Sequence, residues 1–481
     1  MNAPTLFFYD LETSGISPRS ARIMQFAGQR TTLDLESIGE PVNILVRLTE
    51  DVLPEPDAIL ITGITPQTTL ADGVTEAEFL KTFQSEIATP GTIMLGFNTV
   101  RFDDEFMRFL HYRNFYDPYE WQWQDGRGKW DLLDVVRMTR ALRPDGIKWP
   151  FDAKGNPTNR LELLTKLNGL SHEHAHDALS DVYATIEVAR LIRAKQPKLF
   201  QYLFEMRDKK KVMELVKKNE PFVYASGRYP SEFEKTTVAV AVADCPKKQG
   251  AFVFDLRQDP NDFKDLSAEQ LADAWRWKKP DEPGLRLPIK TLQYNHCPAV
   301  APLGVLDATT QERLKIDLET IQKHFKALKA IKDFPERLLK ANEILEKKQQ
   351  TSWLSNESDV DAKLYDGFLE DNDRNLLSVV RAASPNELGE LVDDFKDPRC
   401  KALLPLYKAR NFSKDLTDEE REAWEAFRTQ RLLGGGAKSA MAKFMARLQE
   451  IAARPGLTGE QQYVLEELQL YAQSIMPVTE E

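Results

Sequence analysis

Apolar residues come in short runs through the first third of the chain, and these runs predict a sheet with helices packed against it. Further along, apolar positions recur at helical spacing, for example at Phe106, Phe109 and Leu110. Strand-like segments lie near residues 5–10, 23–32, 42–48 and 92–95. Helices that alternate with strands in this way indicate an α/β domain over residues 1–196.

The pattern changes after Lys195-Gln196-Pro197, which we take as a domain boundary. Short apolar segments bounded by turn residues predict strands at residues 222–224, 237–243, 251–256 and 289–294. From Gln311 onward the chain is mostly helical, and a linker near residues 349–357 precedes a last helical segment with Lys/Glu-rich faces. The sequence therefore predicts three domains, at residues 1–196, 197–348 and 349–481.

Asp10 and Glu12 follow the apolar run of residues 6–9 and are two residues apart. Successive strand side chains alternate between faces, so both carboxylates point the same way, about 6–7 Å apart along the strand. Two carboxylates beside an apolar sheet repel each other and lose hydration. A divalent cation such as Mg²⁺ or Mn²⁺ relieves both costs. For a lone D-x-E, the alternative is a pair of solvated acids at a strand end.

Three further segments carry side chains of matching chemistry. Asp103 opens a helix after a buried strand, although acids in a first helical turn also complement the helix dipole. His176 and Asp181 are five residues apart, a spacing that does not share one helical face. We therefore expect His176 on the loop before the helix that carries Asp181. Arg160 opens another helical stretch.

Taken in order, D-x-E-T on the first strand, an F-D pair and H-x-A-x-x-D-x-x-A-T resemble the DEDDh family of 3′→5′ exonucleases. Within it, the chain is most similar to the bacterial exodeoxyribonuclease I family. That similarity extends over nearly the whole chain, through residues 100–105, 112–119, 130–135, 141–144, 181–186, 364–368 and 409–412. One position departs from the pattern. Most members place Asn four residues before the aspartate, where this chain has Thr99, with Asn98 one position earlier.

The resemblance implies a ribonuclease H-like α/β exonuclease domain, then an SH3-like β-barrel domain with helical additions, then a C-terminal α-helical domain. It also implies the chemistry: hydrolysis at the 3′ end of single-stranded DNA with two Mg²⁺ ions, or Mn²⁺, and release of 5′-mononucleotides in repair and recombination. Asp10, Glu12 and Asp181 would hold the first ion. Asp10 would bridge to the second, and Asp103 would complete that site.

Three roles outside metal binding follow from the same resemblance. His176 would be the general base, since the ordinary pKa of histidine, about 6.5, suits proton abstraction at neutral pH. Arg160 would contact the scissile phosphate through its planar guanidinium. Glu12 would also meet the 3′ hydroxyl group, which would explain recognition of the strand end.

Residues 101–149 interleave basic and aromatic side chains, as grooves for single strands do. The alternative is that the tryptophans pack in the core and that the charges form ordinary helical ion pairs. Lys209-Lys210-Lys211 favours a solvated helix face. By resemblance, the residues on the DNA path are Arg108, Tyr119, Trp123 and Arg137.

The resemblance also implies a protein partner, the acidic and hydrophobic C-terminal tail of single-strand-binding protein. Arg143 and Tyr202 match positions of the pocket that binds this tail. The alternative is that Arg143 is a surface charge and that Tyr202 is an aromatic residue of the core.

Composition adds limits to this picture. The 481 residues have a net charge of −11, which speaks mainly to solubility, because DNA contact depends on local basic patches. No apolar run is long enough for a membrane span. Three cysteines form no framework, which fits a reducing cytoplasm, and we expect a monomer.

Other interpretations remain at this point. His172, His174 and His176 form an H-x-H-x-H run that suggests zinc, but no C-x-x-C accompanies it. The nearest rival enzyme is a DEDDh exonuclease that acts on RNA or in proofreading. A rival from another class is a catalytically silent DNA-binding recruitment module.

Overall fold

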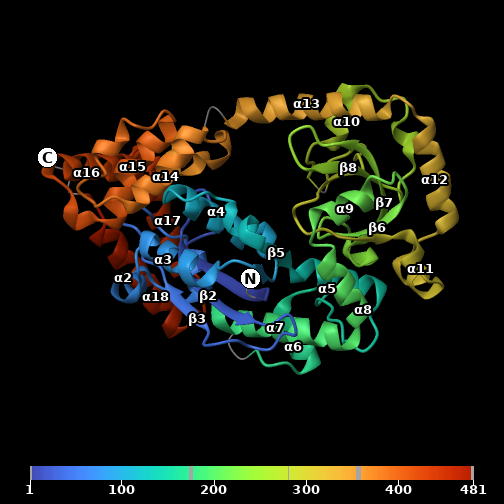
Figure 1. The fold of residues 1–481 in the computed structure, drawn as a ribbon, viewed down its shortest axis with the longest axis horizontal. Helices are drawn as coiled ribbons and strands as arrows, with labels where there is room; N and C mark the ends of the chain where they lie inside the picture. The colour runs from blue at the N-terminus through green and yellow to red at the C-terminus, as the bar shows by residue number, and fades with distance from the viewer. Residues whose placement is uncertain (1–2, 173–176, 280, 354–358, 478–481) are drawn as a thin grey trace.

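The chain folds into three domains, with the N-terminal one between the other two in the computed structural model (Figure 1). The structure describes residues 3–172, 177–279, 281–353 and 359–477. Helix α13 (Phe334–Trp353) extends from the second domain toward the third. Within the described ranges, no helix is both long enough and apolar enough to cross a membrane.

The N-terminal domain is built on a five-stranded sheet in the order β3-β2-β1-β4-β5. Strand β2 pairs antiparallel with β1 and β3, whereas β4 runs parallel to both β1 and β5. Strand β1 is therefore central, with partners on both sides. The strands are β1 (Thr5–Thr13), β2 (Ile23–Thr31), β3 (Val42–Leu45), β4 (Thr92–Gly96) and β5 (Gly128–Asp131).

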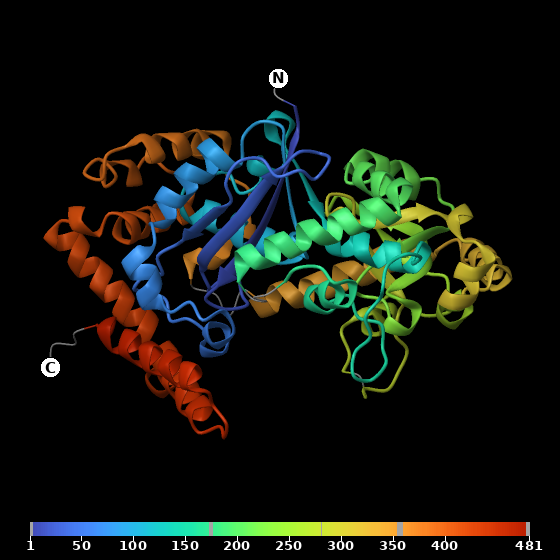
Figure 2. The same ribbon diagram turned by 90° about the horizontal axis from the view of Figure 1, so that it is seen from below.

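Side chains of β1 alternate between two apolar cores on opposite faces of this sheet. Leu6 and Phe8 join a core with helices α5 (Leu132–Leu142) and α7 (Ala178–Lys195). Phe7 and Tyr9 join a core with α3 (Glu76–Thr82) and α4 (Asp103–Arg113). Figure 2 shows the sheet between these helices. The remaining helices of the domain are α1 (Pro56–Thr62), α2 (Pro66–Asp72) and α6 (Leu161–Asn168).

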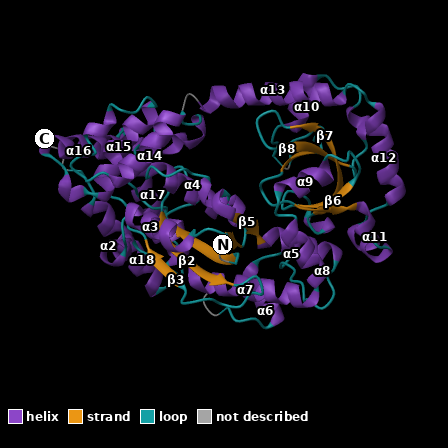
Figure 3. Cartoon of the chain, viewed as in Figure 1, coloured by secondary structure: helices purple, strands orange, loops and turns teal. Residues whose placement is uncertain are grey.

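Helix α8 (Pro197–Glu205) leads into the second domain, which includes α9 (Lys209–Val216) and an antiparallel sheet in the order β10-β6-β7-β8-β9 (Figure 3). The sequence predicted four of these strands and missed β10, because four residues that end in proline give no alternation to recognise. The strands are β6 (Phe222–Ala225), β7 (Thr236–Asp244), β8 (Gly250–Asp255), β9 (Ile289–Gln293) and β10 (Ala299–Pro302). The added helices besides α13 are α10 (Ala268–Trp275), α11 (Ala308–Leu314) and α12 (Leu318–Ala330).

The C-terminal domain is helical, as the sequence predicts. Leu377, Leu403 and Tyr407 of this domain pack with Phe109 and Tyr112 of α4 in one buried core. Helix α4 is thus held between the sheet and the C-terminal domain. The helices are α14 (Asp371–Ala382), α15 (Pro398–Asn411), α16 (Asp418–Leu433), α17 (Ala440–Ala452) and α18 (Gly459–Ser474).

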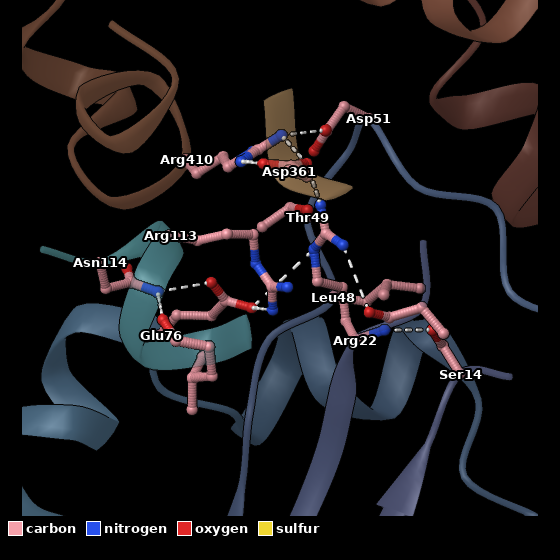
Figure 4. A network of polar contacts seen from close by, with 12 residues as sticks. Ser14, Arg22, Leu48, Thr49, Asp51, Glu76, Arg113, Asn114, Asp361 and Arg410 are labelled. Carbon is pink, nitrogen blue, oxygen red and sulfur yellow. Dashed lines mark hydrogen bonds and ion pairs between the residues drawn. The ribbon is translucent and has the colours of Figure 1, made fainter. Parts of the chain in front are cut away.

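A buried polar network also joins the C-terminal domain to the N-terminal one (Figure 4). Asp361 accepts hydrogen bonds from Arg22 at 2.6 Å and from Arg410 at 2.7 Å, and Arg410 also donates to Asp51 at 2.8 Å. Burial alone would raise the pKa of Asp361, but Arg410, Arg22 and Arg431 hold this pKa well below its ordinary value. The docking of the two domains therefore depends on charges that are matched and shielded from water.

Candidate active site

Strand β1 presents Asp10 and Glu12 on the face that α7 covers. In the ladder with β2, Asp10 lies opposite Ala27 and Glu12 opposite Gln25. Both acidic residues are partly buried. The sequence predicted that these two carboxylates share one face of the strand, and in the structure they do.

Asp103 reaches the same strand because β4 ends early. Strand β4 pairs with β1 only as far as Leu95, which lies opposite Phe8. Further along β1, the backbone N–H of Leu11 donates to Oδ1 of Asp103 at 3.1 Å. Asp103 is the first residue of α4 and is buried. This hydrogen bond fixes its carboxylate beside the segment that carries Asp10 and Glu12.

The turn from β4 to α4 needs particular residues. A Cβ at Gly96 would lie 2.4 Å from the carbonyl oxygen of Tyr9, so the strands approach this closely only with glycine there. Asn98 follows with a left-handed φ of 74°, and its backbone N–H donates to Asp131 at 3.0 Å. The hydroxyl of Thr99 is buried and has no hydrogen-bond partner among the described residues. Thr99 therefore does not replace the supporting hydrogen bond that the family's Asn would make.

Asp181 lies in the first turn of α7. This helix begins after Asp177, whose side chain accepts a hydrogen bond from the backbone N–H of Ser180. Helix α7 packs against β1 and β2, which brings Asp181 to the face that carries Asp10 and Glu12. Nε2 of His172 lies 2.6 Å from Oδ1 of Asp181.

The pKa values indicate that these acids converge. Burial, and then the charges of Asp103, Asp181 and Asp177, raise the pKa of Asp10 well above its ordinary value. Burial, and then Asp10, Asp181 and Asp177, raise the pKa of Glu12 to about 9. Burial raises the pKa of Asp103 as well. Each cause named for Asp10 and Glu12 favours the protonated acid, and none of these causes is a positive charge from the described residues.

The donor set fits a hard divalent cation, because carboxylate oxygens are the ligands that Mg²⁺ and Mn²⁺ prefer. In the part of the chain that the structure describes, however, no three histidine, cysteine or acidic side chains already stand in an arrangement that could hold a metal ion. One oxygen of Asp103 is bonded to the Leu11 amide and one of Asp181 to His172. The carboxylates would therefore have to rotate before they could share an ion.

The predicted set also includes Arg160, for the scissile phosphate, and His176, as the general base. Arg160 immediately precedes α6, is 67% exposed and forms an ion pair with Glu162. His176 lies outside the residues that the structure describes.

A cavity of about 1560 Å³ lies between the domains, and we call it the interdomain groove. It reaches α4 at Glu105, two residues beyond Asp103, but Asp103 and the other three predicted metal ligands are not in its lining. Its basic side chains are Arg19, Arg108, Arg127, Lys129, Arg207, Lys209, Lys211, Lys247 and Lys248. Its aromatic side chains are Tyr119, Trp123, Phe204, His296, Tyr365 and Phe368.

Three of the four predicted DNA-path residues line the groove. Arg108 forms an ion pair with Glu105, and its guanidinium lies 5.7 Å from the ring centre of Tyr119. Trp123 is 63% exposed. Arg137 is not in the lining and bonds instead to Asp134 at 2.6 Å.

Sequence reasoning missed the part of the groove that the other domains supply. Lys209 and Lys211 line it, where the sequence favoured a solvated helix face. Lys247 and Lys248 come from the turn between β7 and β8, and a pair of lysines in a tight turn was a signal that could have been followed. Phe368 lies in the segment 364–368 that carries the family resemblance, but the sequence assigned it no role.

Arg143 and Tyr202 both lie where the first two domains meet. Arg143 donates to the carbonyl of Val305 at 3.2 Å and lies 3.7 Å from Asp307. The hydroxyl of Tyr202 donates to the carbonyl of Val300 at 3.1 Å. Both side chains thus contact the segment of residues 300–307.

Comparison with known proteins covers nearly all of the chain. Family models match an exonuclease domain at residues 7–189, the exonuclease I SH3-like domain at 207–343 and the exonuclease I C-terminal domain at 358–475. Exodeoxyribonuclease I of Haemophilus influenzae is 39% identical over 97% of this chain and 98% of its own length. Exodeoxyribonuclease I of Escherichia coli is 40% identical over 89% of each chain.

Solved structures agree with this assignment. The moderately thermophilic exonuclease I of Methylocaldum szegediense has a TM-score of 0.91 and 42% identity, over 98% of this chain and all of its own. E. coli exonuclease I in complex with a dA16 oligonucleotide has a TM-score of 0.89 and 36% identity over the same shares. With its three domains in this order and its acidic cluster on the central strand, the chain is an exonuclease and belongs to the exodeoxyribonuclease I family.

Proposed function

We propose that this protein removes 5′-mononucleotides from the 3′ end of single-stranded DNA, in repair and recombination. The observation that carries the proposal is the set of acids that raise one another's pKa beside β1, at the start of a helix that also lines a basic, aromatic groove. Structures of the E. coli relative include complexes with single-stranded DNA and with a dA16 oligonucleotide, which supports the same class of substrate.

Asp10, Glu12, Asp103 and Asp181 would hold two Mg²⁺ ions, or Mn²⁺. Bound in a pair, such ions activate a water and stabilise the leaving oxygen of a phosphodiester. Glu12 would also accept a hydrogen bond from the 3′ hydroxyl group and so select strand ends.

His176 would take the proton of the attacking water, and Arg160 would bind the scissile phosphate. In that role Arg160 would exchange its ion pair with Glu162 for the phosphate. An exposed guanidinium on a loop before a helix can make this exchange at small cost, because surface ion pairs contribute about 0–1 kcal/mol.

The interdomain groove would carry the strand toward the acids. Its lysines and arginines would neutralise phosphates, and Tyr119 and Trp123 would stack on bases. Single strands suit such a site because their bases are free to stack. The groove is walled by all three domains, so the whole chain would contribute to binding.

The C-terminal tail of single-strand-binding protein would dock beside Arg143 and Tyr202. A related structure is described as a complex of single-strand-binding protein and exonuclease I with an inhibitor. A partly exposed arginine and a half-buried tyrosine at a domain junction suit a peptide that is acidic and apolar. The protein would act as a cytoplasmic monomer.

End-labelled single-stranded DNA, double-stranded DNA and RNA, each with Mg²⁺ and with EDTA, would test the proposal. We expect Mg²⁺-dependent release of mononucleotides from the 3′ end of single-stranded DNA. Preferred cleavage of RNA would favour the rival exonuclease. Binding without cleavage under any metal would favour a silent recruitment module.

A further inference from the structure

His172 is held on both of its ring nitrogens. Nε2 lies 2.6 Å from Oδ1 of Asp181, and Nδ1 lies 3.1 Å from Oγ1 of Thr165. Thr165 is on α6 and its hydroxyl also contacts the carbonyl of Leu161 at 3.0 Å. The side chain of His172 is only 5% exposed. The ring thus forms a buried link from α6 to the first turn of α7.

We infer that His172 is a positioning residue for Asp181, a role that rests on the proposed metal-dependent function. Nε2–H donates to one carboxylate oxygen and sets the rotation of the group about its Cβ–Cγ bond. The carboxylate is thereby oriented beside the acidic cluster, where the charge of Asp181 acts on both Asp10 and Glu12. Asp181 would thus meet a divalent ion in a fixed orientation.

The cost of losing this bond follows from the exposure of Asp181. Its side chain is 20% exposed, so a freed carboxylate would gain rotamers that point away from the cluster. Hydrogen-bond partners of metal-binding carboxylates typically change metal affinity or activity by about 10–100-fold when they are removed. Since both nitrogens are engaged here, His172 acts through Asp181 and not as a metal ligand itself.

The test compares Mn²⁺ binding by calorimetry, without DNA, in the parent and three variants. His172→Leu keeps the apolar volume and removes the donor, and we expect about tenfold or more loss of Mn²⁺ affinity. His172→Gln places an amide N–H near the position of Nε2 and should recover most of the affinity. Thr165→Val, which preserves shape on α6, should give a smaller loss in the same direction.

A matched control is His324→Asn, far along the chain on α12. His324 also has a buried ring bonded through Nδ1, to the carbonyl of Leu256 at 2.8 Å, and asparagine can retain that bond. We expect its Mn²⁺ affinity to equal the parent's. Thermal melting in EDTA identifies any variant that is not folded, and Thr165→Val remains informative if His172→Leu does not fold.

Steady-state hydrolysis of an oligonucleotide adds a second readout. His172→Leu should lower kcat at fixed Mg²⁺ and leave KM for DNA nearly unchanged, and extra Mg²⁺ should restore part of the rate. The inference is overturned if His172→Leu and Thr165→Val bind Mn²⁺ like the parent, or if glutamine is no better than leucine. If the parent itself does not degrade DNA, the proposed function fails, while the affinity comparison still tests the link.

Discussion

Replacing Glu12 by glutamine should stabilise the metal-free protein at neutral pH. Burial, and then Asp10, Asp181 and Asp177, raise the pKa of Glu12 from 4.5 to about 9. As the pH rises above about 4.5, the unfolded chain releases this proton while the folded protein keeps it. The free energy of unfolding therefore falls as the pH rises from about 4.5 to about 9. Glutamine does not titrate, so Glu12→Gln does not show this loss.

The size of the effect follows from the same values. Neutral pH is about 2.5 pH units above the ordinary pKa of Glu12, and each unit is worth about 1.4 kcal/mol. The full cost is thus about 3.5 kcal/mol at pH 7. Glu12 is partly exposed, so solvent screening reduces the expected gain of Glu12→Gln to about 1–3 kcal/mol.

Urea unfolding in EDTA at about pH 5, 7 and 8.5 would measure this gain. Glu86→Gln, at an exposed glutamate, is the matched control and should follow the parent at each pH. Mg²⁺ should stabilise the parent more than Glu12→Gln, since glutamine weakens the ion's binding. If parent and Glu12→Gln show the same dependence of stability on pH, the acids do not share a buried cluster and the reasoning is refuted.

Three more predictions concern the site, the partner and the domain joint. Asp103→Asn should abolish hydrolysis yet retain binding of a fluorescent oligonucleotide in anisotropy, and full nuclease activity would remove Asp103 from the metal set. Arg143→Ala should weaken binding of a labelled tail peptide from single-strand-binding protein by about tenfold, roughly 1.4 kcal/mol, and unchanged affinity would place the tail elsewhere. Asp361→Asn should lower the free energy of unfolding by about 3–5 kcal/mol, because it removes the buried negative charge that both Arg22 and Arg410 pair with. Asp359→Asn, which removes a more exposed charge two residues away, should cost about 1 kcal/mol or less, and equal losses would contradict a buried ionic joint.

The sequence predicted those parts of the site that depend on local periodicity. Asp10 and Glu12 share a face because strand side chains alternate, and this rule needs no knowledge of the rest of the fold. The first turn of α7 was likewise evident from the apolar spacing that follows Asp181. The ribonuclease H-like, SH3-like and helical domains came from the family resemblance, and the comparisons confirm them.

Features that depend on distant segments could not be predicted in this way. Asp103 and Asp104 are adjacent acids in one helical turn, and only the packed sheet sends one to the Leu11 amide and the other to the hydroxyl of Tyr9. Arg137 has the same composition signals as Arg108 but is bonded to Asp134, away from the groove. The groove walls from the second and third domains meet only after the chain has folded.

Strand β4 ends at Gly96, several positions before β1 does, and this mismatch in length has a structural consequence. Beyond that point β1 has no backbone partner from β4, and the carboxylate of Asp103 accepts the hydrogen bond of the Leu11 N–H instead. If β4 were longer by two residues, its own carbonyls would compete for that amide and displace the carboxylate. The geometry of the acidic cluster therefore depends on where β4 ends as well as on the acids themselves. Insertions near residue 96 should consequently be less tolerated than many substitutions.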